Sequence, residues 1–216
     1  YDSPLETPEG IGCWAESNAV CYANTYTELA TNRESGLSAL ATALTGWAPL
    51  WGLHLSANRV PNMHVRIECD LNNSTDFSIL GDWIGSQLKS QWDMPYGPMP
   101  VISGLPSELS FEMRKALTAA AANFGCPMLW VEGTTRIPNE VNYQGELSFT
   151  SLDLEECYQR LGPKGTVDLV VIGCPQASIG EIRSVVAEVR GRMELGLRIP
   201  ENRLWIFTSR TIHDTL

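Results

Sequence analysis

The chain has 216 residues, of which 44% are hydrophobic and 19% are charged, a composition that indicates a folded globular protein rather than a disordered one. Its formal net charge of -10 is spread over many acidic residues, which excludes a basic surface for nucleic acid or anionic membranes. The sequence contains no apolar run typical of a membrane span or signal peptide, and its six cysteines include no CxxC pair. We therefore expect a reducing, cytoplasmic setting.

The first part of the chain is expected to be rich in helix. Residues 1–12 are punctuated by proline and glycine and predict a loop. Small and apolar residues recur at helical spacing over 15–30 and again over 37–44, where Gly46 is suited to end the helix. The polar residues 31–36 between these helices predict a loop, which is either a binding loop or a solvated connector.

Further elements are predicted before residue 126. Ser74 or Thr75 and Ser110 are suited to cap helices, whereas Gly81 and Gly85 weaken the first of these helices by roughly 1 kcal/mol each. The predicted elements are strands at 47–55, 64–69 and 100–103 and helices at 75–89 and 110–124.

The last third of the chain alternates apolar strands with helices. Strands are predicted at 128–132, 168–172 and 203–208, with helices at 152–161 and 178–192 between them. This order predicts a parallel sheet with helices on both faces, connected by right-handed crossovers. We therefore expect an α/β protein with three layers, made of a helix-rich segment at 1–125 and an α/β segment at 126–216 of the same catalytic region.

Cys174 follows the apolar strand that ends at Gly173 and precedes a predicted helix. A thiol near the positive end of a helix dipole is stabilised as a thiolate, so Cys174 is a candidate nucleophile or metal ligand. It is equally suited to be a small buried residue at a tight turn. The standard phosphate-loop, dinucleotide, zinc-protease and GxSxG motifs are absent, and the three histidines His54, His64 and His213 give no clear partner for a nucleophilic cysteine.

Several separate blocks, in the same order, resemble aconitase X, the divergent branch of the aconitase superfamily. The most specific is Trp14-Ala15-Glu16-Ser17-Asn18-Ala19, followed by Thr31-Asn32-Arg33-Glu34. The other blocks are Gly12 to Ala23, Ser38 to Gly46, Gly52-Leu53-His54-Leu55 with Asn58-Arg59, and Ile172-Gly173-Cys174-Pro175 through Ser178. The resemblance covers most of the chain and is weaker between Asn72 and Pro127.

The resemblance implies a hydro-lyase, because the family includes cis-3-hydroxy-L-proline and mevalonate 5-phosphate dehydratases. It also implies an iron-sulfur cluster or mononuclear iron that polarises the hydroxyl of a small hydroxy-acid substrate. At matching positions, Cys174 becomes the expected metal ligand. The expected contributors to substrate binding are Glu16, Ser17, Asn18, Asn32 and Arg33. An arginine and an asparagine are suited to hold a carboxylate.

The family further implies a small swivelling subunit or fused domain that carries the catalytic base. We therefore expect this chain to be an internal fragment whose catalytic residues lie partly outside it. It departs from the family at Ala30 and Gln176, where arginine and histidine are usual, which leaves the particular hydroxy acid open. Cys13 and Cys21 are suited to packing or to the metal site. The alternatives are a non-catalytic module on the same scaffold and a hydrolase with Cys174 as nucleophile.

Overall fold

A computed structural model of the chain describes residues 9–88 and 96–216. They form two compact units, the smaller comprising Leu161–Leu216 and the larger the described residues up to Arg160. The predicted boundary between the segments 1–125 and 126–216 therefore lies inside the larger unit, and the two units divide at Arg160 instead. The predicted loop at 1–8 and the end of the predicted helix at Lys89 lie outside the described residues.

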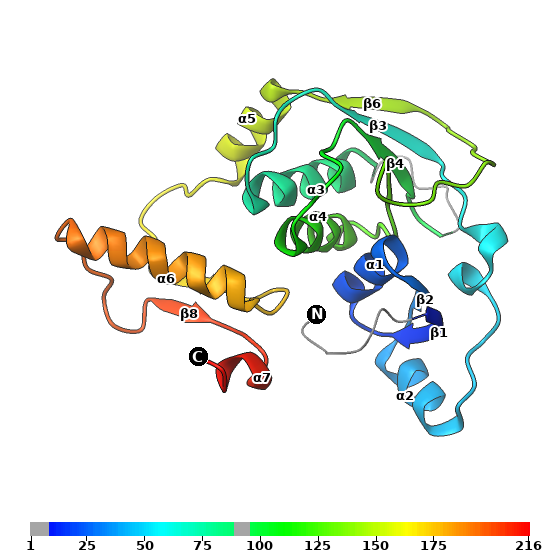
Figure 1. Cartoon of the computed structure of the whole chain (residues 1–216), viewed down its shortest axis with the longest axis horizontal. Coiled ribbons are helices and arrows are strands. Elements are labelled where there is room, and N and C mark those ends of the chain that lie inside the picture. Colours follow the sequence, from blue (N-terminus) through cyan, green and yellow to red (C-terminus); the bar gives the residue numbers. More distant parts are fainter. Residues whose placement is uncertain (1–8, 89–95) are drawn as a thin grey trace. The chain divides into compact units, whose positions relative to one another are not determined.

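The larger unit begins with two parallel strands joined by a helix, all near the blue end of the ribbon in Figure 1. Strand β1 (Glu9–Trp14) pairs with β2 (Glu28–Arg33), and helix α1 (Ser17–Tyr26) connects them. The loops predicted at 1–12 and 31–36 are therefore wrong at residues 9–12 and 31–33, which are strand. Both strands are short and carry polar residues, so their pairing with each other, rather than an apolar alternation, makes them strands.

Helix α2 (Gly36–Thr45) has the predicted end, because Gly46 adopts the left-handed conformation with φ +73°. The strand predicted at 47–55 is wrong. Two single 3-10 turns, η1 (Gly52–His54) and η2 (Ser56–Asn58), occupy its second half and the residues that follow. Gly52 has φ +60°, which a strand does not allow.

Four parallel strands form the main sheet in the order β5-β4-β3-β6. Strand β4 (Pro100–Ser103) has the predicted bounds, and β3 (Met63–Ile67) and β5 (Trp130–Val131) were predicted with slightly different bounds. No element was predicted at β6 (Glu146–Phe149). The helices of this region are α3 (Ser74–Leu88), α4 (Phe111–Asn123) and α5 (Ser151–Leu161). All three agree with the predicted helices to within a few residues.

Helices α3 and α4 lie side by side (Figure 1) because two glycines allow close approach. A Cβ atom at Gly81 would lie 2.4 Å from the backbone oxygen of Leu117, and one at Gly85 would lie 2.4 Å from the ring of Phe124. These glycines were expected only to weaken the helix; their benefit is the contact between helices. The cap of α3 also differs from the prediction, because the side chain of Asn73 accepts from the backbone N–H groups of Thr75 and Asp76.

Apolar side chains cover both faces of the sheet at β4. Ile102 of β4 and Leu129 pack in the main core with α3 and α4. Val101 and Trp130, on the opposite face, pack with Leu53 of η1. The sheet therefore holds η1 against its second face, which fixes the turn that follows α2.

In the smaller unit, strand β7 (Val170–Ile172) pairs in parallel with β8 (Leu204–Ile206) and packs with helices α6 (Ile179–Glu194) and α7 (Arg210–His213). The expectation that the three strands after residue 128 share one sheet is wrong, since β5 belongs to the four-stranded sheet. The α/β class with parallel sheets is confirmed. Among the described residues, no helix combines the length and apolar character needed to cross a membrane.

Candidate functional site

The carboxyl ends of β1 and β2 form the candidate site, because parallel pairing brings the residues after both strands to one edge. Cys13 is opposite Asn32, and Trp14 is opposite Arg33. Helix α1 begins directly after β1, and Glu16 caps it by accepting the backbone N–H of Asn18 over 3.2 Å. The pairing therefore brings the two most specific blocks of the sequence together.

Asn32 positions the turn that completes this edge. Its Oδ1 accepts the backbone N–H of Leu53 over 2.7 Å, and its Nδ2 donates to the backbone oxygen of Trp51 over 3.2 Å. Glycine is required between these residues, because a Cβ at Gly52 would lie 2.4 Å from Asn32 Oδ1. Asn32 therefore holds η1 in place with both ends of its buried amide. The two hydrogen bonds from Asn32 to the backbone of Trp51 and Leu53 are called the Asn32 clamp.

Three side chains with metal-binding atoms meet beside the Asn32 clamp. The Sγ of Cys13, a carboxylate oxygen of Glu34 and a ring nitrogen of His54 all lie within 4.8 Å of one another. Cys13 comes from β1, Glu34 follows β2 and His54 ends η1. Three parts of the chain far apart in sequence thus build one group, the Cys13–Glu34–His54 cluster.

Glu34 has one engaged and one available oxygen. Its Oε2 accepts the hydroxyl of Ser38 over 2.7 Å. Its Oε1 is buried and has no hydrogen-bond partner among the described residues. A buried carboxylate oxygen without a partner is costly, so this atom is suited to receive a cation or a donor from a ligand.

His54 is buried between two backbone carbonyls. Its Nδ1 lies 2.6 Å from the oxygen of Pro49, and its Nε2 lies 3.1 Å from the oxygen of Gly12. Because carbonyl oxygens only accept, one of these contacts must be released before the ring can bind a metal. His54 therefore also ties β1 to the segment after α2.

The cluster matches the ligand chemistry of a single transition-metal ion. Thiolate, carboxylate and imidazole all bind such ions at roughly 2.0–2.3 Å, so one ion could reach all three after small rotations. An iron-sulfur cluster held by protein thiolates commonly needs several cysteines. Cys13 is the one cysteine in this group of described residues. The donor set therefore fits a transition metal such as iron.

The other expected site residues differ in exposure. Arg33 and Glu16 are exposed at the strand ends, and Ser17 is half-buried. Asn18 is buried, and its Oδ1 has no hydrogen-bond partner among the described residues. An exposed guanidinium and an available amide oxygen at one edge are suited to a polar ligand.

Cys174 lies in the smaller unit and is exposed, in the turn between β7 and α6 as expected. However, α6 begins only at Ile179, with Ser178 as its cap, so Cys174 precedes the helix by several residues. The influence of a helix dipole falls off within the first turn. The structure therefore gives less support to the expected activation of this thiol.

The sequence analysis did not predict the role of Glu34 in the cluster. Cys13 and His54 were left open, and Glu34 appeared only inside the block Thr31 to Glu34. The polar residues at the end of that block could have indicated a ligand. Because residues 31–36 were predicted as a loop, Glu34 was not placed beside Cys13. Only the pairing of β1 with β2 shows that Cys13 and Glu34 lie at the same edge.

Comparison with known proteins identifies a family model and several relatives that this chain resembles. A family model described as "Aconitase X first domain" matches residues 6–57, the segment that contains the whole cluster. The phosphomevalonate dehydratase large subunit of Methanosarcina mazei is 32% identical over 92% of this chain and 47% of its own length. The cis-3-hydroxy-L-proline dehydratase of Pseudomonas aeruginosa is 31% identical over 92% of this chain and 34% of its own length.

A solved structure extends the similarity to the fold. The crystal structure of Thermococcus kodakaraensis aconitase X in its holo-form superposes with a TM-score of 0.81 and 29% sequence identity. The match covers 98% of this chain and 53% of that chain. The chain thus spans about half the length, or less, of the relatives that it matches.

Proposed function

We propose that this chain forms part of a hydro-lyase of the aconitase X family, which its similarity to that family supports. The substrate is a small hydroxy acid such as cis-3-hydroxy-L-proline or phosphomevalonate, from which the enzyme removes water. The observation that carries the proposal is the Cys13–Glu34–His54 cluster, inside the segment that matches the first domain of the family.

The cluster is proposed to hold iron, which when bound acts as a Lewis acid on the substrate hydroxyl. Cys13 and Glu34 would supply two anionic ligands. His54 would supply a third, neutral ligand once one of its ring nitrogens releases the backbone carbonyl that it contacts. Arg33, exposed beside the cluster, binds the substrate carboxylate. Glu16 keeps the start of α1 in place, so that Asn18 can offer its buried amide to the substrate.

The proton acceptor of the reaction is proposed to lie on a small partner subunit or fused domain. The relative from Methanosarcina mazei is named a large subunit, which supports a second component. Helix α2 offers an apolar surface for it, with Leu37 81%, Leu44 78% and the following Trp47 82% exposed. The described α2 residues carry no charge, as expected for a contact surface.

The protein is proposed to work in the cytoplasm. All six cysteines are free, including Cys21 and Cys126 in the core, which supports a reducing compartment. Cys174 stays proposed as a further metal ligand, since the family resemblance at Ile172 to Ser178 includes it.

The test is the iron content of the full-length protein purified without oxygen. We expect iron to bind, and Cys13→Ser and Glu34→Gln each to lower the iron content about tenfold or more while the fold persists by circular dichroism. Cys174→Ser tests the second ligand proposal separately. Cys157→Ser removes a thiol from the core, away from the cluster, and is the control.

Two results would contradict the proposal. One is iron content that is unchanged by Cys13→Ser and Glu34→Gln. The other is an active, metal-free protein that loses activity when Cys174 alone is alkylated, which would favour a cysteine-nucleophile hydrolase.

A further inference from the structure

The larger unit contains a cavity whose lining does not include Cys13, Glu34 or His54. Its volume is about 750 Å³, and it is bounded by the end of α1, the segment after η1, the first turn of α4 and the loop after β5. Three arginines line it, Arg59, Arg114 and Arg136, so we call it the arginine cavity. It lies beyond the carboxyl end of β5, where parallel sheets commonly bind ligands.

The walls of the arginine cavity carry polar atoms that lack partners. Buried side-chain atoms without a hydrogen bond among the described residues include Tyr26 OH, Arg114 Nε, Trp130 Nε1 and Thr134 Oγ1, and all four residues line this cavity. Trp130 is only 9% exposed. Buried polar groups normally have partners, so four such atoms in the walls of one cavity favour a polar ligand there.

These four atoms favour a ligand that accepts hydrogen bonds over one that donates them. Arg114 Nε and Trp130 Nε1 can only donate, and the hydroxyl groups of Tyr26 and Thr134 can donate as well. Burial is the largest cause of the raised pKa of Tyr26, so its phenol keeps the proton near neutral pH. A ligand with several acceptor oxygens would match these donors in type.

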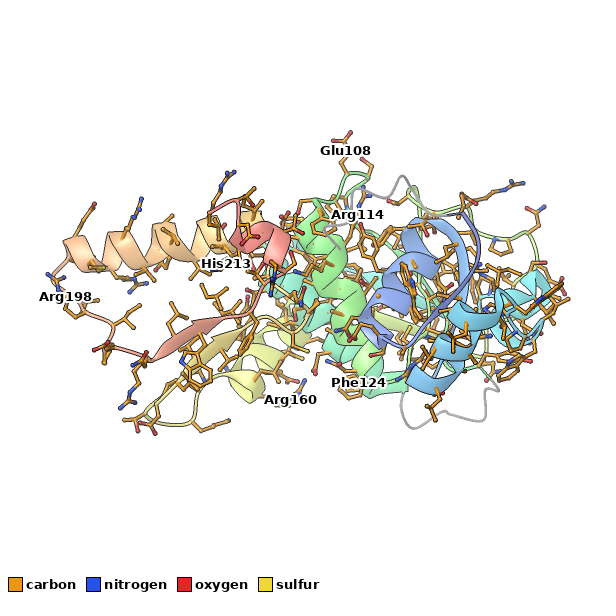
Figure 2. The ribbon with its side chains drawn as sticks, turned by 90° about the horizontal axis from the view of Figure 1, so that it is seen from below. Glu108, Arg114, Phe124, Arg160, Arg198 and His213 are labelled. Carbon is orange, nitrogen blue, oxygen red and sulfur yellow. The ribbon has the colours of Figure 1, made fainter. Side chains whose placement is uncertain are left out.

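Two of the arginines are held in place. The guanidinium of Arg114, a residue labelled on α4 in Figure 2, lies 5.3 Å from the ring centre of Tyr26. Arg59 donates from Nη2 to the backbone oxygen of Asn24 over 2.9 Å. Arg136 is exposed at the rim. Preorganised guanidinium groups are suited to carboxylate and phosphate oxygens.

Two acidic residues also line the cavity, Glu28 and Glu140. Both are exposed, and Glu28 lies close enough to Arg59 to favour its charged form, although burial lowers the pKa of Arg59 more. Three arginines against two exposed carboxylates leave an excess of positive charge at the buried wall. The protein as a whole has a net charge of -10, so this local excess is unusual for the chain.

We propose that the arginine cavity binds a small anion through carboxylate or phosphate oxygens, at a place distinct from the Cys13–Glu34–His54 cluster. Glu28 begins β2 and lines the cavity, whereas Glu34 follows the other end of the same strand. Six strand residues span roughly 16 Å, so a small ligand at the Glu28 end of β2 does not reach Glu34. The site goes beyond the proposed dehydration and does not depend on iron.

The test is calorimetric titration of the full-length protein with inorganic phosphate and, separately, with succinate. We expect saturable binding of at least one of them with a Kd on the order of 10 mM or tighter. Tighter binding of phosphate assigns the site to phosphate ligands, and tighter binding of succinate assigns it to carboxylates. Absence of saturable binding for both would overturn the proposal.

Matched variants locate the binding. Arg114→Gln removes a charged donor and is expected to weaken binding about tenfold or more. Tyr26→Phe removes only a hydroxyl and is expected to weaken binding several-fold without lowering the Tm of the free protein, because that hydroxyl has no partner among the described residues. This combination separates a ligand-binding role from a structural one.

Arg66→Gln is the control for lost charge. Arg66 lies on the exposed side of β3, where it pairs with Glu146, and it does not line the cavity. Its replacement should leave binding unchanged. Equal effects of Arg66→Gln and Arg114→Gln would mean nonspecific attraction and would overturn the proposal. Glu34→Gln should also leave binding unchanged, which distinguishes failure here from failure of the proposed metal site.

Discussion

Asn32 holds two backbone segments together through opposite ends of one side-chain amide. Aspartate at this position would still accept from Leu53, but its second oxygen would face the carbonyl of Trp51. The resemblance to aconitase X implied that Asn32 binds substrate, and that role stays a prediction. The structure adds a positioning role, because the clamp brings η1 and therefore His54 to the edge of β1 and β2.

Cys126 makes a testable contribution to stability at alkaline pH. It is fully buried and contacts the backbone oxygens of Pro98 and Met128, and burial, followed by the neighbouring Cys21, raises its pKa well above the ordinary 9.0. Below pH 9 the thiol is protonated in both folded and unfolded chains. As pH rises above 9, the unfolded thiol ionises and the buried one does not, so stability falls.

We expect the free energy of unfolding to decrease between pH 9 and pH 10 by up to about 1.4 kcal/mol per pH unit from this thiol. Urea unfolding at several pH values measures it. Cys126→Ala should reduce the slope, whatever its effect on stability at pH 7. Some slope should remain, because burial also raises the pKa of Cys69. An unchanged slope in Cys126→Ala would contradict the assignment.

Helices α3 and α4 show why a helix-weakening residue can stabilise a fold. Gly81 and Gly85 lie one turn apart, so they form a groove on α3 that receives the backbone of α4 and the ring of Phe124. Figure 2 shows Arg114 and Phe124 towards the two ends of α4. The glycines thus connect the main core to the helix that carries an arginine of the arginine cavity.

We expect Gly81→Ala to destabilise the protein by about 2 kcal/mol or more, although alanine favours helix by about 1 kcal/mol. The added methyl group would meet the Leu117 oxygen at 2.4 Å, and backbone cannot rotate away as a side chain can. Thermal unfolding measures the change. Gly36→Ala is the control, because a Cβ at the first residue of α2 meets nothing within 4 Å, and we expect equal or higher stability.

At the scale of the whole molecule, exposed apolar surface on the larger unit is concentrated on α2 and the residues after it. Leu37, Leu40 and Leu44 lie along one face of the helix at spacings of three and four residues, and they are 81%, 56% and 78% exposed. No residue of α2 is buried. A helix of this composition without a buried residue is typical of a contact surface.

We expect Leu40→Glu and Leu44→Glu to weaken association with the proposed small subunit or domain about tenfold or more, without loss of fold. Co-purification and analytical ultracentrifugation of the two components measure this. Leu152→Glu, at a 64% exposed position of α5, is the control and should leave association unchanged. Normal association of both α2 variants would show that the partner binds elsewhere.

The sequence by itself determined most helices of this protein, because their signals are local. Ser110 caps α4 and Gly46 ends α2, both as expected, and α6 begins within one residue of its predicted start at Ser178. These residues act on backbone groups of their own turn, so no tertiary contact is needed to recognise them. The resemblance to aconitase X likewise depended on short local blocks and is confirmed.

Only the tertiary structure decided the short strands and the cluster. β1, β2 and β6 carry no clear apolar alternation and are strands because of their partners, which sequence periodicity cannot supply. Once β1 pairs with β2 in parallel, Cys13 and Glu34 lie at one edge, and the Asn32 clamp adds His54. The arginine cavity has the same cause, since α1, α4 and the loop after β5 meet only in the packed fold.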